Sequence, residues 1–319
     1  MALHIVRFHY QEQPRWGLLE GSRITPLDLP CTTTAELIEQ GHAAIQGARG
    51  GDGAELALAD AALLSPITGE AKVLCQGANY RQHMIDSGMN PDDKSFNMFF
   101  TKSSASITDP SGEIIKPAHV QLLDYEIELT LVLGKQTRGP VEVTAANLHE
   151  FVAGLCIGND VSARDVQIPQ MQFHKGKSYR TFCPMGPVLC LLDKSELHYL
   201  DDMQLQLTVN GETRQQDSTA NLVFKPAETL TEYSQIHDFA PGDVLMTGTP
   251  AGCALGLPSP AVTKVAALLP ESKKWQLFIK SQKRRQQYLQ AGDVVESTIT
   301  SRDQTLDLGK QRHTIKDGV

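Results

Sequence analysis

Apolar and polar residues alternate in many short runs along this chain, and a period of two predicts β-strands. Residues 204–216 alternate on both sides of Asn210-Gly211, a dipeptide that favours a two-residue hairpin turn. Residues 242–252 and 292–301 each begin with a Gly-Asp turn and continue as a strand. Other strands are expected at residues 4–8, 16–21, 23–28, 72–80 and 123–134.

Helical periodicity is less frequent. An Ala-rich stretch within residues 32–66 is the first helical region. Helices are also predicted over residues 144–154 and 226–239, and Pro226 lies in the first turn of the second of these. Strands dominate, and the helices do not alternate regularly with them. We therefore expect an α+β fold with a β-rich core, made of a small N-terminal domain at residues 1–69 and a main body at 70–319.

Composition narrows the class of protein. The chain has 319 residues, of which 41% are hydrophobic and 21% charged, with a formal net charge of -8. This acidic balance argues against a nucleic-acid partner. There is no signal-peptide pattern and no apolar run long enough to span a bilayer. The six cysteines have no metal-type spacing, so we expect free thiols and a soluble cytoplasmic protein.

The run at residues 123–134, LDYEIELTLVLG, places carboxylates inside a strand-forming segment. Successive side chains of a strand point to opposite faces, so Glu126 and Glu128 share the face opposite Ile127 and Leu129. Two neighbouring carboxylates repel each other and are costly to bury unpaired. Either this face is exposed to solvent, or both oxygens hold a divalent cation.

A third carboxylate favours the cation. Residues 151–167 are apolar until Gly158-Asn159-Asp160, which places Asp160 at the end of an expected strand. Three carboxylates and water suit a hard ion, Mg²⁺ or Mn²⁺, and Ca²⁺ also fits. Structural Zn²⁺ would require Cys or His ligands, which neither segment supplies.

Four motifs together resemble the fumarylacetoacetate hydrolase family, at residues 126–135, 158–167, 175–187 and 242–252. The resemblance extends from about residue 70 to 302, with the motifs in the family's order. It implies a mixed β-sandwich roll, a homodimer, and one divalent metal that acts on 2,4-dioxo or 2-oxo-enol acids. The ligands implied by the resemblance are Glu126, Glu128 and Asp160.

The resemblance also implies roles for residues that would contact an anionic oxo-acid substrate. Lys177 matches the family's catalytic lysine. Arg164 and Gln167 match pocket-lining positions, although Arg164 could equally pair with Asp165 or Glu128. The Thr-Pro turn at residues 247–250 would present Gly248 and Thr249 to the substrate.

A general base is implied at His83, in a short helical lid at residues 77–91. In the family a carboxylate three residues later orients this histidine, and here Asp86 has that position. The chain departs from the pattern, because the partner is usually glutamate and aspartate is one methylene shorter. This departure leaves open whether the protein hydrolyses its substrate.

A second departure is an inserted segment around residues 253–290. Its basic helix at 271–290 places Trp275, Phe278 and Ile279 on one face, which favours packing over the body, at a dimer interface or beside the pocket.

The sequence thus predicts a metal-dependent hydrolase that cleaves the C–C bond of an acylpyruvate-like 2,4-dioxo acid, of the kind formed in aromatic catabolism. One alternative is an isomerase or decarboxylase that uses the same metal without a water-activating dyad. Another is a non-catalytic, metal-stabilised binding protein.

Overall fold

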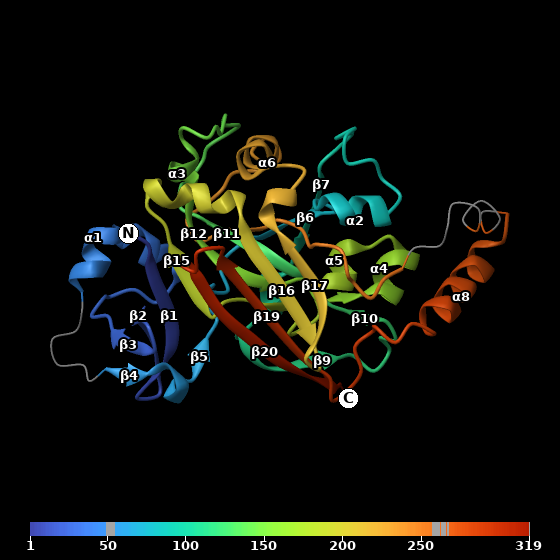
Figure 1. The fold of residues 1–319 in the computed structure, drawn as a ribbon, viewed down its shortest axis with the longest axis horizontal. Coiled ribbons are helices and arrows are strands. Elements are labelled where there is room, and N and C mark those ends of the chain that lie inside the picture. Colours follow the sequence, from blue (N-terminus) through green and yellow to red (C-terminus); the bar gives the residue numbers. More distant parts are fainter. Residues whose placement is uncertain (49–54, 257–261, 263–265, 267, 319) are drawn as a thin grey trace.

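Two β-sheets pack face to face and form most of the protein (Figure 1). The computed structural model describes residues 1–48, 55–256, 262, 266 and 268–318. The smaller sheet crosses the middle of the larger one, with β16 (Met203–Val209) against β11 (Ile127–Leu133) and β20 (Asp307–Asp317) against β15 (Val188–Leu191). This arrangement confirms the predicted β-rich α+β fold.

The larger sheet has eleven strands in the order β4-β3-β2-β1-β15-β12-β11-β18-β6-β7, with β5 also paired to β1. Strand β11 is therefore central, between β12 and β18. The remaining strands of this sheet are β1 (Leu3–Tyr10), β2 (Gln13–Glu20), β3 (Arg23–Pro26), β4 (Leu56–Ala57), β5 (Leu63–Leu64), β6 (Val73–Gly77), β7 (Met98–Lys102), β12 (Val152–Asn159) and β18 (Val244–Met246).

The smaller sheet has five strands in the order β17-β16-β19-β20-β9. Strands β16 and β17 form the predicted hairpin, since Asn210 and Gly211 both take positive φ, 53° and 80°. Two short pairs stand apart from the main sheets. The strands not yet bounded are β8 (Ile107–Thr108), β9 (Ser111–Lys116), β10 (Leu123–Asp124), β13 (Ser162–Ala163), β14 (Cys183–Pro184), β17 (Glu212–Ser218) and β19 (Val294–Ser301).

Helices surround the sheets and begin with ordinary signals. Helix α1 starts with a capping box between Thr33 and Glu36, and α6 starts at Pro226 as predicted. The α-helices are α1 (Thr34–Gly47), α2 (Arg81–Asp86), α3 (Leu148–Phe151), α4 (Arg164–Gln170), α5 (Phe173–Lys177), α6 (Pro226–Tyr233) and α8 (Glu271–Gln282). The 3₁₀ turns are η1 (Leu58–Asp60), η2 (Ser104–Ser106), η3 (Lys194–Asp201) and η4 (Thr219–Asn221).

The helix expected at residues 144–154 is shorter than predicted. Only α3 is helical, because the chain from Val152 onwards pairs with strands on both sides as β12. Strand pairing in the centre of a large sheet thus outweighs the helical periodicity. The helix expected at 271–290 ends at Gln282, and part of the inserted segment (257–261, 263–265 and 267) lies outside the described residues.

Alternation along the strands divides the core in two. On β11, Leu129 and Leu131 belong to the core shared with the smaller sheet, whereas Val132 belongs to the core on the opposite face. The N-terminal strands continue the larger sheet, because β1 pairs antiparallel with β15. Among the described residues, no helix is long and apolar enough to cross a bilayer.

Gly158 on β12 gives a test of this packing. A Cβ added there would lie 2.4 Å from Thr130 Oγ1 and 2.9 Å from Met246 Cε, in the centre of the sheet. Gly158→Ala is therefore expected to destabilise the protein by about 1–3 kcal/mol through overpacking. Gly69→Ala is the control, because nothing lies within 4 Å of its Cβ position. Urea unfolding of both variants measures the difference, and equal stabilities would contradict the packing described here.

Candidate active site

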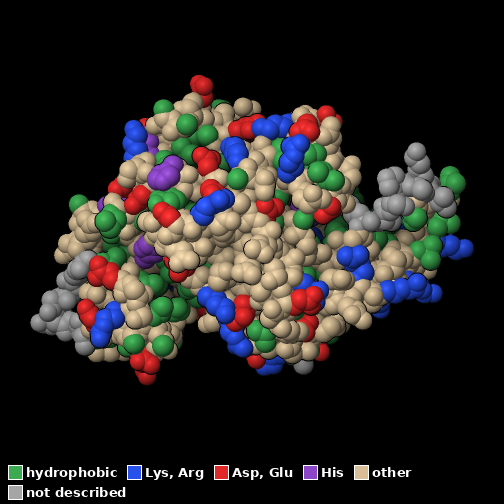
Figure 2. Space-filling view, in the orientation of Figure 1, with side chains coloured by type: hydrophobic (Ala, Val, Ile, Leu, Met, Phe, Trp, Pro, Cys, Tyr) green, Lys and Arg blue, Asp and Glu red, His purple; other side chains and the backbone are tan. Residues whose placement is uncertain are grey.

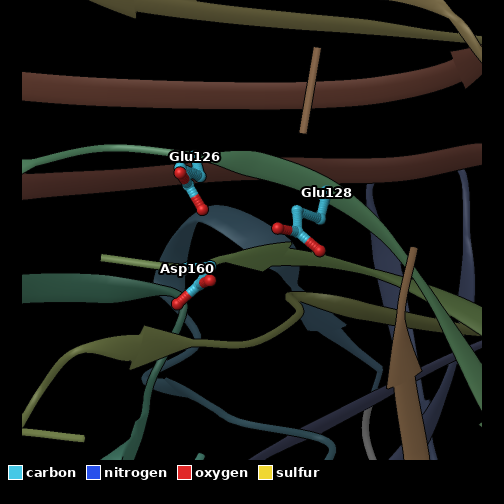
Figure 3. Close-up of side chains that lie close together, drawn as sticks. All are labelled: Glu126, Glu128 and Asp160. Atoms are coloured by element: carbon cyan, nitrogen blue, oxygen red, sulfur yellow. The ribbon is translucent and has the colours of Figure 1, made fainter. Parts of the chain in front are cut away.

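Three buried carboxylates converge where β11 and β12 meet. Glu126 immediately precedes β11, Glu128 lies within it, and Asp160 follows the last residue of β12. The backbone aligns them, because Asp160 N donates to Glu126 O at 2.8 Å and Glu126 N donates to Asn159 Oδ1 at 3.0 Å. One oxygen of each carboxylate lies within 4.8 Å of the others. Figure 3 shows the three side chains directed toward one another.

Burial decides between the two interpretations of this strand. Every residue of β11 is buried, and Glu128 is 1% exposed. The hypothesis of a solvent-exposed carboxylate face is therefore wrong. The predicted alternation holds, since Ile127 and Leu129 belong to the core beneath the smaller sheet.

Two lysines reach the carboxylates from other elements. Lys177 Nζ, at the end of α5, lies 2.8 Å from Glu126 Oε2, donates to Asp160 Oδ2, and donates to Ser162 Oγ at 2.9 Å. Lys102 Nζ lies 2.5 Å from Asp160 Oδ1. Burial alone would lower the pKa of Lys177, but Asp160 and Glu126 outweigh it, and the pKa is raised. Lys177 is therefore protonated at neutral pH.

Arg164 joins a fourth carboxylate, Asp124, to this cluster. Its Nε donates to Asp124 Oδ2 at 2.8 Å, its Nη2 donates to Glu126 Oε1, and its Nη1 donates to Gln167 Oε1 at 2.8 Å. The alternative partners considered for Arg164, Asp165 and Glu128, are not its partners. Burial would raise the pKa of Glu126, but Arg164 and Lys177 hold that pKa below its usual range.

Of the three carboxylates, Glu128 is the one that forms no ion pair with a lysine or arginine among the described residues. Its Oε2 accepts one hydrogen bond, from Gly248 N at 2.8 Å. Burial, together with Asp160 and Glu126, raises its pKa well above the usual value. A buried carboxylate with one neutral donor is unfavourable alone, so the donor set fits a hard divalent cation such as Mg²⁺ or Mn²⁺. Glu126, Glu128 and Asp160 would hold it.

The residues predicted to contact substrate at the Thr-Pro turn are engaged within the protein. Thr249 Oγ1 donates to Ile127 O at 2.9 Å and accepts from Gln215 Nε2 at 2.8 Å. Gly248 takes a φ of +88°, and an added Cβ would lie 3.0 Å from Asn79 Cβ. The turn therefore supports the carboxylate strand directly, and contact of Gly248 or Thr249 with substrate stays a prediction.

The lid histidine lies near the cluster, and its expected partner Asp86 bonds to a different residue. His83, on α2, is half-buried, and burial together with the charge of Arg164 lowers its pKa against the charges of Glu126 and Asp124. Asp86 is exposed and accepts from Gln82 Nε2 at 2.8 Å. In the described structure no hydrogen bond joins His83 to Asp86, so the dyad stays a prediction.

Sequence reasoning missed Lys102 and Gln215 and gave Asp124 no role. Gln215, on β17, bonds to Ile127 N at 3.0 Å and to Pro250 O at 2.9 Å, which ties the carboxylate strand to the Thr-Pro turn. Asp124 carried a signal, because it shares the strand face of Glu126 and Glu128. Lys102 and Gln215 lie on distant strands, and no local pattern distinguishes them.

Comparisons with known proteins agree with this geometry. The model described as fumarylacetoacetate (FAA) hydrolase C-terminal matches residues 72–316, and one described as Rv2993c-like, N-terminal, matches residues 3–66. A human mitochondrial oxaloacetate tautomerase is 36% identical over 242 residues, which cover 74% of each chain.

Two solved structures are similar over almost the whole chain. A fumarylacetoacetate hydrolase from psychrophilic Exiguobacterium antarcticum has a TM-score of 0.76 and 28% identity, covering 99% of this chain and 100% of that one. A 5-carboxymethyl-2-hydroxymuconate delta-isomerase from Mycobacterium smegmatis has a TM-score of 0.70 and 25% identity, with the same coverage.

Proposed function

The chain belongs to the fumarylacetoacetate hydrolase family, and from this premise we propose that it is a divalent-metal-dependent tautomerase of a 2-oxo acid of the oxaloacetate type. One observation carries the choice of reaction. Asp86 is exposed and bonded to Gln82, so the pair that would activate water is not assembled beside the buried carboxylates. Tautomerisation consumes no water and needs no such pair.

The reaction exchanges one proton between two atoms of the substrate. A proton leaves C3 while another reaches the oxygen on C2, so the substrate changes from keto to enol without losing an atom. A divalent ion on Glu126, Glu128 and Asp160 would act as a Lewis acid that makes the C3 proton more acidic. The protein must then supply a positive charge near the C2 oxygen and a base near C3.

Two residues can fill these roles. The ammonium of Lys177 is buried among the carboxylates, where it can stabilise the negative charge that develops on the substrate oxygen. The His83 imidazole is the candidate base, because burial lowers its pKa and keeps it neutral at pH 7. Arg164 is held by Asp124 and Glu126, which makes it a support for the carboxylates.

Hydrolysis of an acylpyruvate is the second candidate, favoured by the position of His83 close to the same charged groups. Movement of the lid could bring a carboxylate to the imidazole. The similarity to the Exiguobacterium hydrolase also supports this candidate.

A substrate panel separates the two reactions. Oxaloacetate, acetylpyruvate and fumarylpyruvate would be followed by enol absorbance and by release of pyruvate, with Mg²⁺, with Mn²⁺ and after EDTA. We expect metal-dependent change of the oxaloacetate enol signal without a second product. Efficient release of pyruvate and a carboxylic acid from an acylpyruvate would contradict the tautomerase proposal and support the hydrolase. Turnover of no compound with either metal would contradict both.

Substitutions on the lid give an independent prediction. His83→Gln is expected to lower kcat by about 10²–10⁴-fold, the usual contribution of a general base. Asp86→Asn is expected to leave kcat almost unchanged, because Asp86 bonds to Gln82. The pKa of His83 is lowered from 6.5, so activity should stay level near neutrality and fall only in more acidic solution, as the imidazole gains a proton. A large loss of kcat in Asp86→Asn would support the water-activating dyad.

A further inference from the structure

Asp124 connects the metal centre to the start of the inserted segment. It is fully buried, and besides Arg164 it accepts hydrogen bonds from Ala254 N at 2.7 Å and Leu255 N at 3.0 Å. Arg164 in turn bonds to Glu126, one of the three candidate metal ligands. The position of the backbone at residues 254–255 therefore affects the position of a metal-ligand carboxylate through two charged side chains.

The end of α8 fixes that backbone. Gln282 Nε2 donates to Gly256 O at 2.7 Å, and Gln282 Oε1 accepts from Gly256 N at 3.2 Å and from Tyr288 OH at 2.9 Å. Arg285 Nε donates to Ala254 O at 2.7 Å. The approach is close, because a Cβ on Gly256 would lie 2.4 Å from Arg285 Nη1. Both ends of the Gln282 amide are thus committed to this contact.

Much of α8 projects from the body, and Phe278 and Ile279 near its C-terminal end pack against the main hydrophobic core, as the sequence led us to expect. Gln282 is the one residue of Glu271–Gln282 that is buried, at 4% exposed, while Trp275, Phe278 and Ile279 are half-buried. Figure 2 shows Lys and Arg side chains along the projecting segment that Figure 1 labels α8. Gln282 therefore brings a buried polar group of α8 against Gly256.

The chain after α8 returns to the same place. Leu289 N donates to Leu123 O at 2.9 Å, so the segment pairs with the residue directly before Asp124. Both flanks of the inserted segment therefore meet at Asp124, one through the backbone of Ala254 and Leu255 and the other through Leu289.

We propose that Gln282 is a positioning residue for the metal centre: it holds residues 254–256 so that Asp124 and Arg164 orient Glu126. The proposal rests on the cation site used in the proposed function, but it does not depend on which reaction the site performs. It gives the inserted segment a role inside the protein. Outer residues that orient metal ligands typically change metal affinity by about 10–100-fold when they are replaced.

Mn²⁺ affinity in the full-length protein tests the proposal, measured by titration calorimetry. Gln282→Met keeps the side-chain length and removes the amide, and we expect the Kd for Mn²⁺ to rise by about 10-fold. Gln276→Met is the matched control, because Gln276 is an exposed residue of the same helix. The control should leave the Kd unchanged. A Gln282→Met protein with a lower Tm but an unchanged Kd would overturn the proposal.

Arg285→Met provides the second variant, in case Gln282→Met does not fold. Arg285 is exposed, and its replacement removes the side-chain bond to the Ala254 carbonyl, so a folded protein is expected. We expect a smaller rise in the Kd, about 3-fold, given that Gln282 remains. An unchanged Kd in folded Arg285→Met would also overturn the proposal. Absence of Mn²⁺ binding in the parent protein would instead refute the metal centre itself.

Discussion

Replacing Glu128 with glutamine is expected to abolish metal-dependent turnover and, in the metal-free protein, to raise the free energy of unfolding. Glu128 is buried with one backbone donor and no cation among the described residues, and Asp160 and Glu126 add repulsion that raises its pKa. Glutamine keeps the shape and the bond from Gly248 N but removes the charge. We expect a gain of about 1–3 kcal/mol, the cost of an unsatisfied buried polar group.

The pH dependence of stability follows from the same shift. A carboxyl whose pKa is raised in the folded state binds its proton more tightly there than in the unfolded chain. Its contribution to stability is therefore largest at low pH and is lost as the pH rises from the unfolded pKa toward the raised one. Glu128→Gln removes this loss, so the advantage of the variant should grow between acidic and neutral pH.

Two measurements check this result: urea unfolding in EDTA, and calorimetric titration with Mn²⁺. Glu142→Gln, an exposed residue, is the control and should change neither. A Glu128→Gln protein that binds Mn²⁺ like the parent would remove Glu128 from the ligand set. A lower free energy of unfolding for Glu128→Gln than for the parent in EDTA would show that the protein stabilises the Glu128 carboxylate more than its one hydrogen bond indicates.

The carboxylates were predictable because their signal is local. Strand alternation placed Glu126 and Glu128 on one face, and the end of an apolar run marked Asp160. The Asn210-Gly211 turn was predictable for the same reason, since two residues determine its geometry. The burial of the carboxylate face was not predictable from the strand alone, because β11 becomes central only when β12 and β18 pair with it and the smaller sheet covers it.

The cations around the carboxylates depend on long-range contacts. Arg164 lies 40 residues from Asp124 and Lys102 lies 58 residues from Asp160 along the chain, and only the assembled sheets bring each pair together. Motif resemblance singled out Lys177 and Arg164, whereas the alternative partners considered for Arg164, Asp165 and Glu128, are wrong. No sequence pattern marks a glutamine such as Gln215 or Gln282 that acts through both ends of its amide, because glutamine is common on exposed strands and helices.

Lys177→Met is expected to lower the stability of the metal-free protein and kcat, but to raise the affinity for Mn²⁺. Without the ammonium, Glu126 and Asp160 keep Arg164 and Lys102 but lose the cation that bridges them. Removing one partner of a buried ion pair typically costs about 3–5 kcal/mol, and the remaining cations favour the lower end, about 3 kcal/mol in EDTA. Without the ammonium, the three carboxylates should bind Mn²⁺ more tightly in the variant than in the parent protein. Addition of Mn²⁺ should therefore raise the free energy of unfolding of the variant by more than that of the parent.

Catalysis should fall in the same variant although the metal binds better. The positive charge near the substrate oxygen is gone, and loss of such a group costs about 10²–10³-fold in kcat. Lys175→Met is the matched control, because Lys175 is exposed on the same helix and its ammonium bonds to Gln170. Unfolding in EDTA and in Mn²⁺, together with kcat, gives the three quantities. Tighter Mn²⁺ binding with unchanged kcat would show that Lys177 balances the charge of the carboxylates without taking part in the reaction.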